Sequence, residues 1–146
     1  MNRLSIFILG GFAIGLVAVF LSNIPSVSPE DQRIFKQQVL TSIGTFPTEW
    51  DHVTFEEIGH RSIRLFLPYR DSPSSLDQVK NDMDRVARAV LRVLVDNGRN
   101  PQQEKIAVFV HGQVPERGER GATLVRYFGK TMYDYNSGEL IFKPAK

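Results

Sequence analysis

The apolar and polar positions divide this chain into two unequal parts. The first is an unbroken run of eighteen uncharged, mostly apolar residues from Leu4 to Leu21. A helix of that length is long enough to cross the hydrocarbon core of a bilayer, which is roughly 30 Å thick. The rest of the chain mixes polar residues with short apolar repeats. We therefore predict a transmembrane helix at residues 1–24, a short linker at 25–29 and one folded domain at 30–146.

The end of the apolar run favours a permanent anchor over a removed leader. A secretory leader has an apolar core of about 7 to 15 residues, followed by a cleavage site made of small residues. The run here is longer, and although Ser26 and Ser28 are small, Pro29 would follow the scissile bond. We expect a signal anchor. A cleaved, secreted soluble domain is the alternative.

The charges beside the apolar run predict its orientation. Arg3 lies directly before the run, whereas Glu30 and Asp31 come before the first cations on its other side. Because Lys and Arg are favoured on the cytoplasmic side, we expect a cytoplasmic N-terminus and a C-terminal domain outside the cytoplasm. This describes a single-pass protein of the cell inner (cytoplasmic) membrane with a periplasmic or otherwise extracytoplasmic domain.

Small residues form a stripe along the predicted membrane helix. Gly11, Gly15, Ala18 and Ser22 are spaced by four, three and four positions, so a helix places them on one face. Faces of small residues let two membrane helices pack closely. We expect this face to pack against an integral membrane protein partner or against a second copy of the chain. Gly and Ala are also common in membrane helices that have no partner.

The first amphipathic helix of the folded domain is predicted from Pro29 to about Ile43. Ser28 is a suitable N-cap, and proline fits the first turn of a helix. Phe35, Val39 and Ile43 recur every four residues and give this helix an apolar edge to bury.

A second, longer helix is predicted from Ser75 to Asn97. Ser75 and Gln78 occupy capping-box positions, and Gly98 follows the last turn. At about 100° per residue, its apolar and charged faces separate clearly. The apolar face carries Val79, Met83, Val86, Val90, Val93 and Leu94, and the opposite face carries Arg85, Arg88 and Arg92.

Short β-prone runs fill the remainder of the domain. They are, in order, residues 52–58, 61–69, 105–114, 122–128, 131–135 and 139–143. Gly59-His60 predicts a hairpin between the first two, and Pro115 to Gly118 predicts a turn after the third. Gly129 and the segment 136–138 separate the last three, which is the spacing of an antiparallel meander. The predicted class is α+β, with a mainly antiparallel sheet and the long amphipathic helix packed on it.

The order of helix, two strands, helix and strand resembles the small αββαβ modules that build rings in membrane-spanning secretion machines. The resemblance covers Pro29 to Val114, follows from the order of the elements and involves no residue motif. It leaves the final strands outside the pattern.

Composition and motifs point away from catalysis. Arg3 is one of the 18 Lys and Arg residues, so 17 remain in the domain against 16 Asp and Glu, a balance that does not suit an electrostatic binder of nucleic acid. The chain has no cysteine, no phosphate-binding loop and no nucleophile elbow. We expect no catalytic residue, no metal and no cofactor.

Scattered polar residues keep a second interpretation open. His52, His60 and His111 lack the local spacing of a zinc site, and the adjacent Glu56 and Glu57 are expected on opposite faces of their strand. A site that the fold assembles from such residues would make the protein an envelope enzyme or a wall-binding protein.

The arginine face of the long helix is a possible partner contact. Guanidinium groups bind oxyanions at two points, so Arg85, Arg88 and Arg92 suit an acidic protein, lipid headgroups or peptidoglycan carboxylates. A solvated helix with acids early and arginines late gives the same pattern without any partner.

The aromatic residues near the C-terminus also allow two interpretations. Tyr127, Phe128, Tyr133 and Tyr135 are interface anchors if the sheet exposes them and core residues if it buries them. The anchor, the small-residue stripe and the missing catalytic motifs together favour a non-catalytic membrane subunit or an assembly or accessory factor of an inner-membrane protein complex. Its small extracytoplasmic domain would bind protein.

Overall fold

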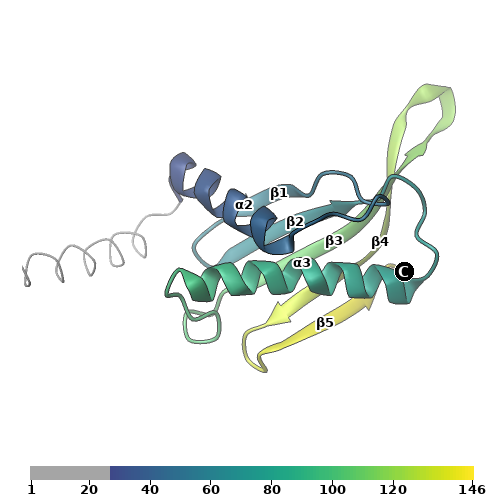
Figure 1. The fold of residues 1–146 in the computed structure, drawn as a ribbon. Coiled ribbons are helices and arrows are strands. Elements are labelled where there is room, and N and C mark those ends of the chain that lie inside the picture. The colour runs from purple at the N-terminus through teal and green to yellow at the C-terminus, as the bar shows by residue number, and fades with distance from the viewer. Residues whose placement is uncertain (1–26) are drawn as a thin grey trace, which may run out of the picture.

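The computed structural model describes residues 27–146 of the chain (Figure 1). The predicted transmembrane helix and its small-residue stripe, Gly11, Gly15, Ala18 and Ser22, lie outside the described residues. No helix within residues 27–146 is long and apolar enough to cross a membrane. These residues form an α+β domain in which one five-stranded, mainly antiparallel sheet carries two helices on one face.

The strands lie in the sheet in the order in which they occur in the chain. The elements are α2 (Pro29–Ile43), β1 (Thr54–Ile58), β2 (Ser62–Pro68), α3 (Leu76–Asp96), β3 (Ala107–Arg117), the short 3₁₀ turn η1 (Glu119–Gly121), β4 (Thr123–Asp134) and β5 (Glu139–Pro144). Neighbouring strands are antiparallel except for β2 and β3, which are parallel. Parallel neighbours need a long crossover, and α3 provides it across one face of the sheet.

Both predicted helices are confirmed, and so are their N-caps. The Ser28 hydroxyl accepts a hydrogen bond from the Asp31 backbone N–H at 3.2 Å, and the Ser75 hydroxyl accepts one from the Gln78 N–H at 3.1 Å. The reciprocal half of the second capping box is not formed on Ser75. The Gln78 side chain instead accepts a hydrogen bond of 3.1 Å from the Ser74 N–H, so both Ser74 and Ser75 cap the N-terminus of α3.

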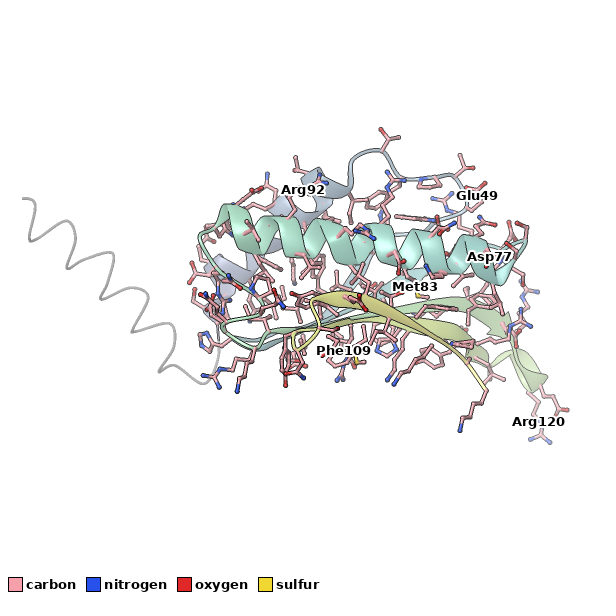
Figure 2. All side chains as sticks on the ribbon, turned by 90° about the horizontal axis from the view of Figure 1, so that it is seen from below. Glu49, Asp77, Met83, Arg92, Phe109 and Arg120 are labelled. Atoms are coloured by element: carbon pink, nitrogen blue, oxygen red, sulfur yellow. The ribbon has the colours of Figure 1, made fainter. Side chains whose placement is uncertain are left out.

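The hydrophobic core lies between the sheet and the two helices. Its helix side is formed by the predicted apolar edges of α2 and α3, and its sheet side by every second residue of the central strands. In Figure 2, Met83 lies between α3 and the sheet. Gly112 of β3 lies opposite Met83 and lets α3 pack close to the sheet. A Cβ at this position would lie 3.1 Å from the Met83 Sδ and 3.2 Å from the Val79 Cγ1.

Two turn predictions in the C-terminal half are wrong. The residues Pro115 to Arg117 continue β3 and pair with β4, so the turn is confined to Gly118 and η1. Gly129 does not separate two strands but lies inside the continuous β4, with a φ of +150° next to a β-bulge. The backbone hydrogen bonds of a long ladder outweighed both local turn signals. The result is a β3–β4 hairpin that projects beyond the rest of the sheet (Figure 1).

The prediction for the two adjacent glutamates is also wrong. A β-bulge in β1 leaves Glu56 without a partner residue in the ladder, while Glu57 pairs with Arg64 of β2. Because a bulge breaks the alternation of side chains, both carboxylates lie toward β2, with Glu56 3.5 Å from the Arg64 guanidinium and Glu57 accepting a bond of 3.3 Å from the Ser62 hydroxyl.

Candidate functional site: the open face of the sheet

The helices cover only one face of the sheet, and the face they leave uncovered is called the open face here. Along β2 and β3 the residues alternate between buried and half-buried, which separates the covered face from the open face. The strand register assigns the open face these side chains: Arg64, Phe66, Phe109, His111, Gln113, Tyr127, Lys130, Met132, Ile141 and Lys143. Figure 2 shows Phe109 on the side of the sheet away from α3.

Aromatic rings and cations are in mutual contact on the open face. The Phe66 ring centroid lies 5.3 Å from that of His111 and 6.3 Å from that of Tyr127. The Phe109 ring has the Arg64 guanidinium 5.5 Å from its centroid and the Lys130 ammonium 5.9 Å from it. The Tyr127 side chain is 50% exposed. Flat rings with positive groups over them are therefore available to a ligand from solvent.

Three basic side chains form a line across the strands, called the central row here. His111 of β3 pairs with Lys130 of β4, and Lys130 pairs with Lys143 of β5. Within residues 27–146 neither lysine forms a salt bridge. Burial lowers the pKa of His111, the nearby Arg64 and Lys130 lower it further, and Glu56 opposes the shift. Burial and the positive surroundings together favour the neutral imidazole, so Lys130 and Lys143 carry the charge of the central row.

The apolar surface of the open face continues onto the β3–β4 hairpin. Leu124 and Val125 are 55% and 46% exposed. Val125 pairs with Pro115, and Tyr127 pairs with Gln113 beside a bulge, so Val125 and Tyr127 extend the same face toward the tip. Figure 2 shows Arg120 at the end of this hairpin, away from the helices.

The aromatic residues near the C-terminus divide between the two roles predicted for them. Tyr127 is exposed on the open face, whereas Tyr133 is buried at 7% exposure on the covered face. Phe128 meets the buried Tyr69 edge to face at 5.9 Å, and Tyr135 packs partly against the core. Only Tyr127 of this group is therefore placed to touch a partner through the open face.

The arginine face of α3 lies beside α2. One of its arginines holds the segment after α2, and the other two line a groove between the helices. Arg85 donates hydrogen bonds of 2.9 Å to the carbonyls of Ile43 and Thr45, and its guanidinium lies 5.4 Å from the Trp50 ring centroid. It therefore fastens the segment after α2 to α3. Arg88 and Arg92 line an open groove of about 480 Å³ between the helices. The prediction that Arg85, Arg88 and Arg92 contact a partner stays a prediction.

A buried polar cluster supports the covered face near the start of α3. One oxygen of the Asp82 carboxylate accepts hydrogen bonds from the Trp50 indole at 3.2 Å and from the Tyr69 hydroxyl at 2.9 Å. Burial raises the pKa of Tyr69, and the hydrogen bond to Asp82 and its charge raise it further. The cluster joins the segment before β1, the residue after β2 and helix α3. Because the three polar groups satisfy one another's hydrogen bonds, they are tolerated in this position.

The scattered histidines are not brought together. His52 precedes β1, His60 lies in the turn between β1 and β2, and His111 lies at the middle of β3. Of the residues proposed for a composite site, His111 and Glu56 share the open face. Among residues 27–146 no group of three or more His, Asp or Glu side chains is arranged to hold a metal ion.

Comparison of the chain with protein families, with curated proteins and with solved structures finds no match.

Sequence reasoning singled out Tyr127, His111 and Glu56 but missed the phenylalanines and lysines of the open face, although a signal for the phenylalanines is present. Val108, Phe109 and Val110 are consecutive apolar residues, and a strand with a wet face does not need an apolar residue on both sides. Phe66 between Leu65 and Leu67 carries the same signal. The cross-strand line of basic residues has no such signal, because it depends on the register between strands.

Proposed function

We propose that this protein is a non-catalytic, single-pass subunit or assembly factor of an inner-membrane complex, which uses the open face to bind another protein. The apolar run from Leu4 to Leu21 and the charges around it support the anchor and an extracytoplasmic domain. The open face supports the binding role.

The observation that carries the binding role is the position of large rings in the middle of an uncovered sheet. Phe66 and Phe109 lie on the two central, parallel strands, where helices would cover both faces of an ordinary parallel pair. Here one face is left to solvent. Clusters of exposed aromatic and aliphatic groups on a soluble domain mark contact surfaces, and aromatic residues are frequent anchors of such surfaces.

The open face is better suited to binding than to chemistry. Its rings and cations touch one another, and its arginine is already paired with Glu56. The hairpin adds Val125 and Tyr127 at one end, which enlarges the surface available to a protein partner. A partner of the size of a folded domain could cover this surface as a second layer, as helices cover the other face.

Site-specific photo-crosslinking in the membranes of the source cell tests this proposal. A benzophenone amino acid at Phe66 or Tyr127 is expected to give one discrete product that co-fractionates with a membrane complex. The same probe at Leu76, exposed at the start of α3, is the control and is expected to give none. Equal products from both faces, or no product from the open face, would contradict the proposed binding surface.

The membrane anchor is tested separately by intact mass and by extraction. A retained anchor predicts the full mass and resistance to alkaline carbonate, whereas a removed leader predicts a shorter, soluble chain. If the stripe packs against a partner, Gly15→Leu is expected to reduce the size of the detergent-solubilised complex. A full-length protein that stays monomeric with or without Gly15→Leu would argue against the packing role.

A further inference from the structure

The central row leaves positive charge unneutralised in the middle of the open face. Neighbouring strands are about 4.8 Å apart, so His111, Lys130 and Lys143 cover about 10 Å across three strands. Directly opposed like charges weaken a strand pair. Lys130 and Lys143 are such a pair, which is unfavourable in the free protein unless an anion lies between them.

The carboxylates that the register places on the open face lie at its borders, away from the central row. Glu56 is paired with Arg64, and Glu57 accepts a hydrogen bond from Ser62, both on the β1 side. At the opposite border, Asp134 accepts bonds of 3.0 Å from the Asn136 backbone and the Ser137 hydroxyl in the turn before β5. Glu139, which pairs with Asp134 in the ladder, lies at the same border. The domain therefore supplies no carboxylate to the central row.

Apolar side chains border the central row on both sides. On one side the register places Phe109, Met132 and Ile141, and on the other it places Tyr127, with Phe66 at the end of the row. A ligand that fits this pattern carries one or two negative charges with apolar groups next to them. An extended peptide offers that spacing, because side chains on one side of a strand repeat about every 6.6 Å.

We propose that the open face binds an extended acidic segment of its protein partner, with carboxylates on Lys130 and Lys143 and neighbouring apolar side chains on Phe66 and Phe109. This inference rests on the proposed binding role of the open face and adds the chemistry of the partner. A single-stranded nucleic acid fits less well. Its line of phosphates would run past the short row toward Glu56 and Glu57 on one side or Asp134 on the other.

Fluorescence anisotropy with the full chain in detergent micelles tests the inference. The probe is a labelled short peptide in which every second residue is Ser and the residues between alternate Glu and Leu, so that an extended peptide presents both to the same side. The comparison peptide has Gln in place of Glu. Empty micelles correct for partition of the peptides into detergent. We expect the acidic peptide to bind at least about tenfold more tightly than the Gln peptide, and added salt to reduce the difference.

A matched pair of double variants locates the binding. Lys130→Gln with Lys143→Gln is expected to lower the affinity for the acidic peptide about tenfold. Arg61→Gln with Lys105→Gln removes two exposed charges that lie outside the strands and the open face, and is expected to leave the affinity within about twofold. Circular dichroism of each variant confirms that the fold is retained.

Three results would overturn the inference. They are equal affinity for the two peptides, unchanged affinity after the lysine substitutions, and tighter binding of a short oligothymidylate than of the acidic peptide. Photo-crosslinking from Phe66 separates this failure from failure of the proposed function. A crosslinked partner together with no acidic preference means that the open face is an interface for a different chemistry.

Discussion

The two faces of one sheet follow opposite rules in this domain. On β2, Ile63, Leu65 and Leu67 point to the helices and are almost completely buried, while Arg64 and Phe66 between them remain accessible. Both faces contain large apolar groups, but among residues 27–146 only the covered face has other groups packed over it. Apolar content alone therefore does not define the core. A face stabilises the fold where another layer covers it, and it is free to bind a partner where none does.

The largest expected difference between the faces is in the cost of truncating neighbouring residues. Leu65→Ala removes a fully buried side chain and is expected to lower the free energy of unfolding by about 2–5 kcal/mol. Phe66→Ala removes a larger side chain from the open face and is expected to cost about 1 kcal/mol. Urea unfolding followed by fluorescence of Trp50, the one tryptophan of the chain, measures both. Equal costs would mean that the open face is part of the core.

The next largest effect concerns the space between α3 and the sheet. Gly112→Leu would push against the Met83 and Val79 side chains, which a Cβ at this position already meets at 3.1 and 3.2 Å. We expect a loss of about 1–3 kcal/mol in unfolding free energy from overpacking. Gln113→Leu, one residue later and on the open face, is the control. A larger loss in the control than in Gly112→Leu would contradict the assignment of the two faces.

Alkaline pH should act on the covered face through Tyr69. Its pKa is raised in the folded protein, so above pH about 10 the unfolded chain releases a proton that the folded chain keeps. Stability is then expected to fall as pH rises, by up to about 1.4 kcal/mol per pH unit from this group. Tyr69→Phe should flatten the fall in unfolding experiments at several pH values. The open-face substitution Tyr127→Phe is the control, and an equal flattening by it would rule out the role of Tyr69.

The smallest effect expected is a gain of stability on the open face. Lys143→Glu replaces the opposed pair of Lys130 and Lys143 by opposite charges and is expected to stabilise the domain by about 0.5 kcal/mol. Lys80→Glu, on α3, removes the 3.0 Å ion pair with Asp84 and should destabilise instead. Thermal unfolding at low and high salt measures both, and the gain should shrink with salt. No gain at low salt would mean that the two ammonium groups do not repel.

The sequence predicted those parts of the fold that depend on local patterns. The ends of α2 and α3, the buried edge Phe35, Val39 and Ile43, and the first hairpin all follow from caps and periodicity, and the structure confirms them. The errors occurred where strand pairing competes with local signals. Pro115 and Gly129 are turn residues by type, but the register of the long β3–β4 ladder holds both within strands.

The candidate site was harder to predict because it depends on which strands become neighbours. Phe66 and His111 are 45 positions apart and meet only because β2 and β3 pair in parallel. Lys130 and Lys143 face each other only in the observed register of β4 and β5. The sequence predicts for Arg85 either a partner contact or a solvated helix face, whereas its bonds to the Ile43 and Thr45 carbonyls depend on how α2 packs against α3. None of these contacts leaves a periodic trace in the chain.

The projecting β3–β4 hairpin is a suitable place to attach a label to this domain. Its tip, Gly118 to Ala122, contributes no buried side chain, and Figure 2 shows Arg120 at the end of the hairpin, away from the helices. A spin label or a short epitope placed at Arg120 should therefore leave the helix-covered layer undisturbed. Because the hairpin continues the central strands, such a reporter would register any tilt of the sheet when another molecule docks.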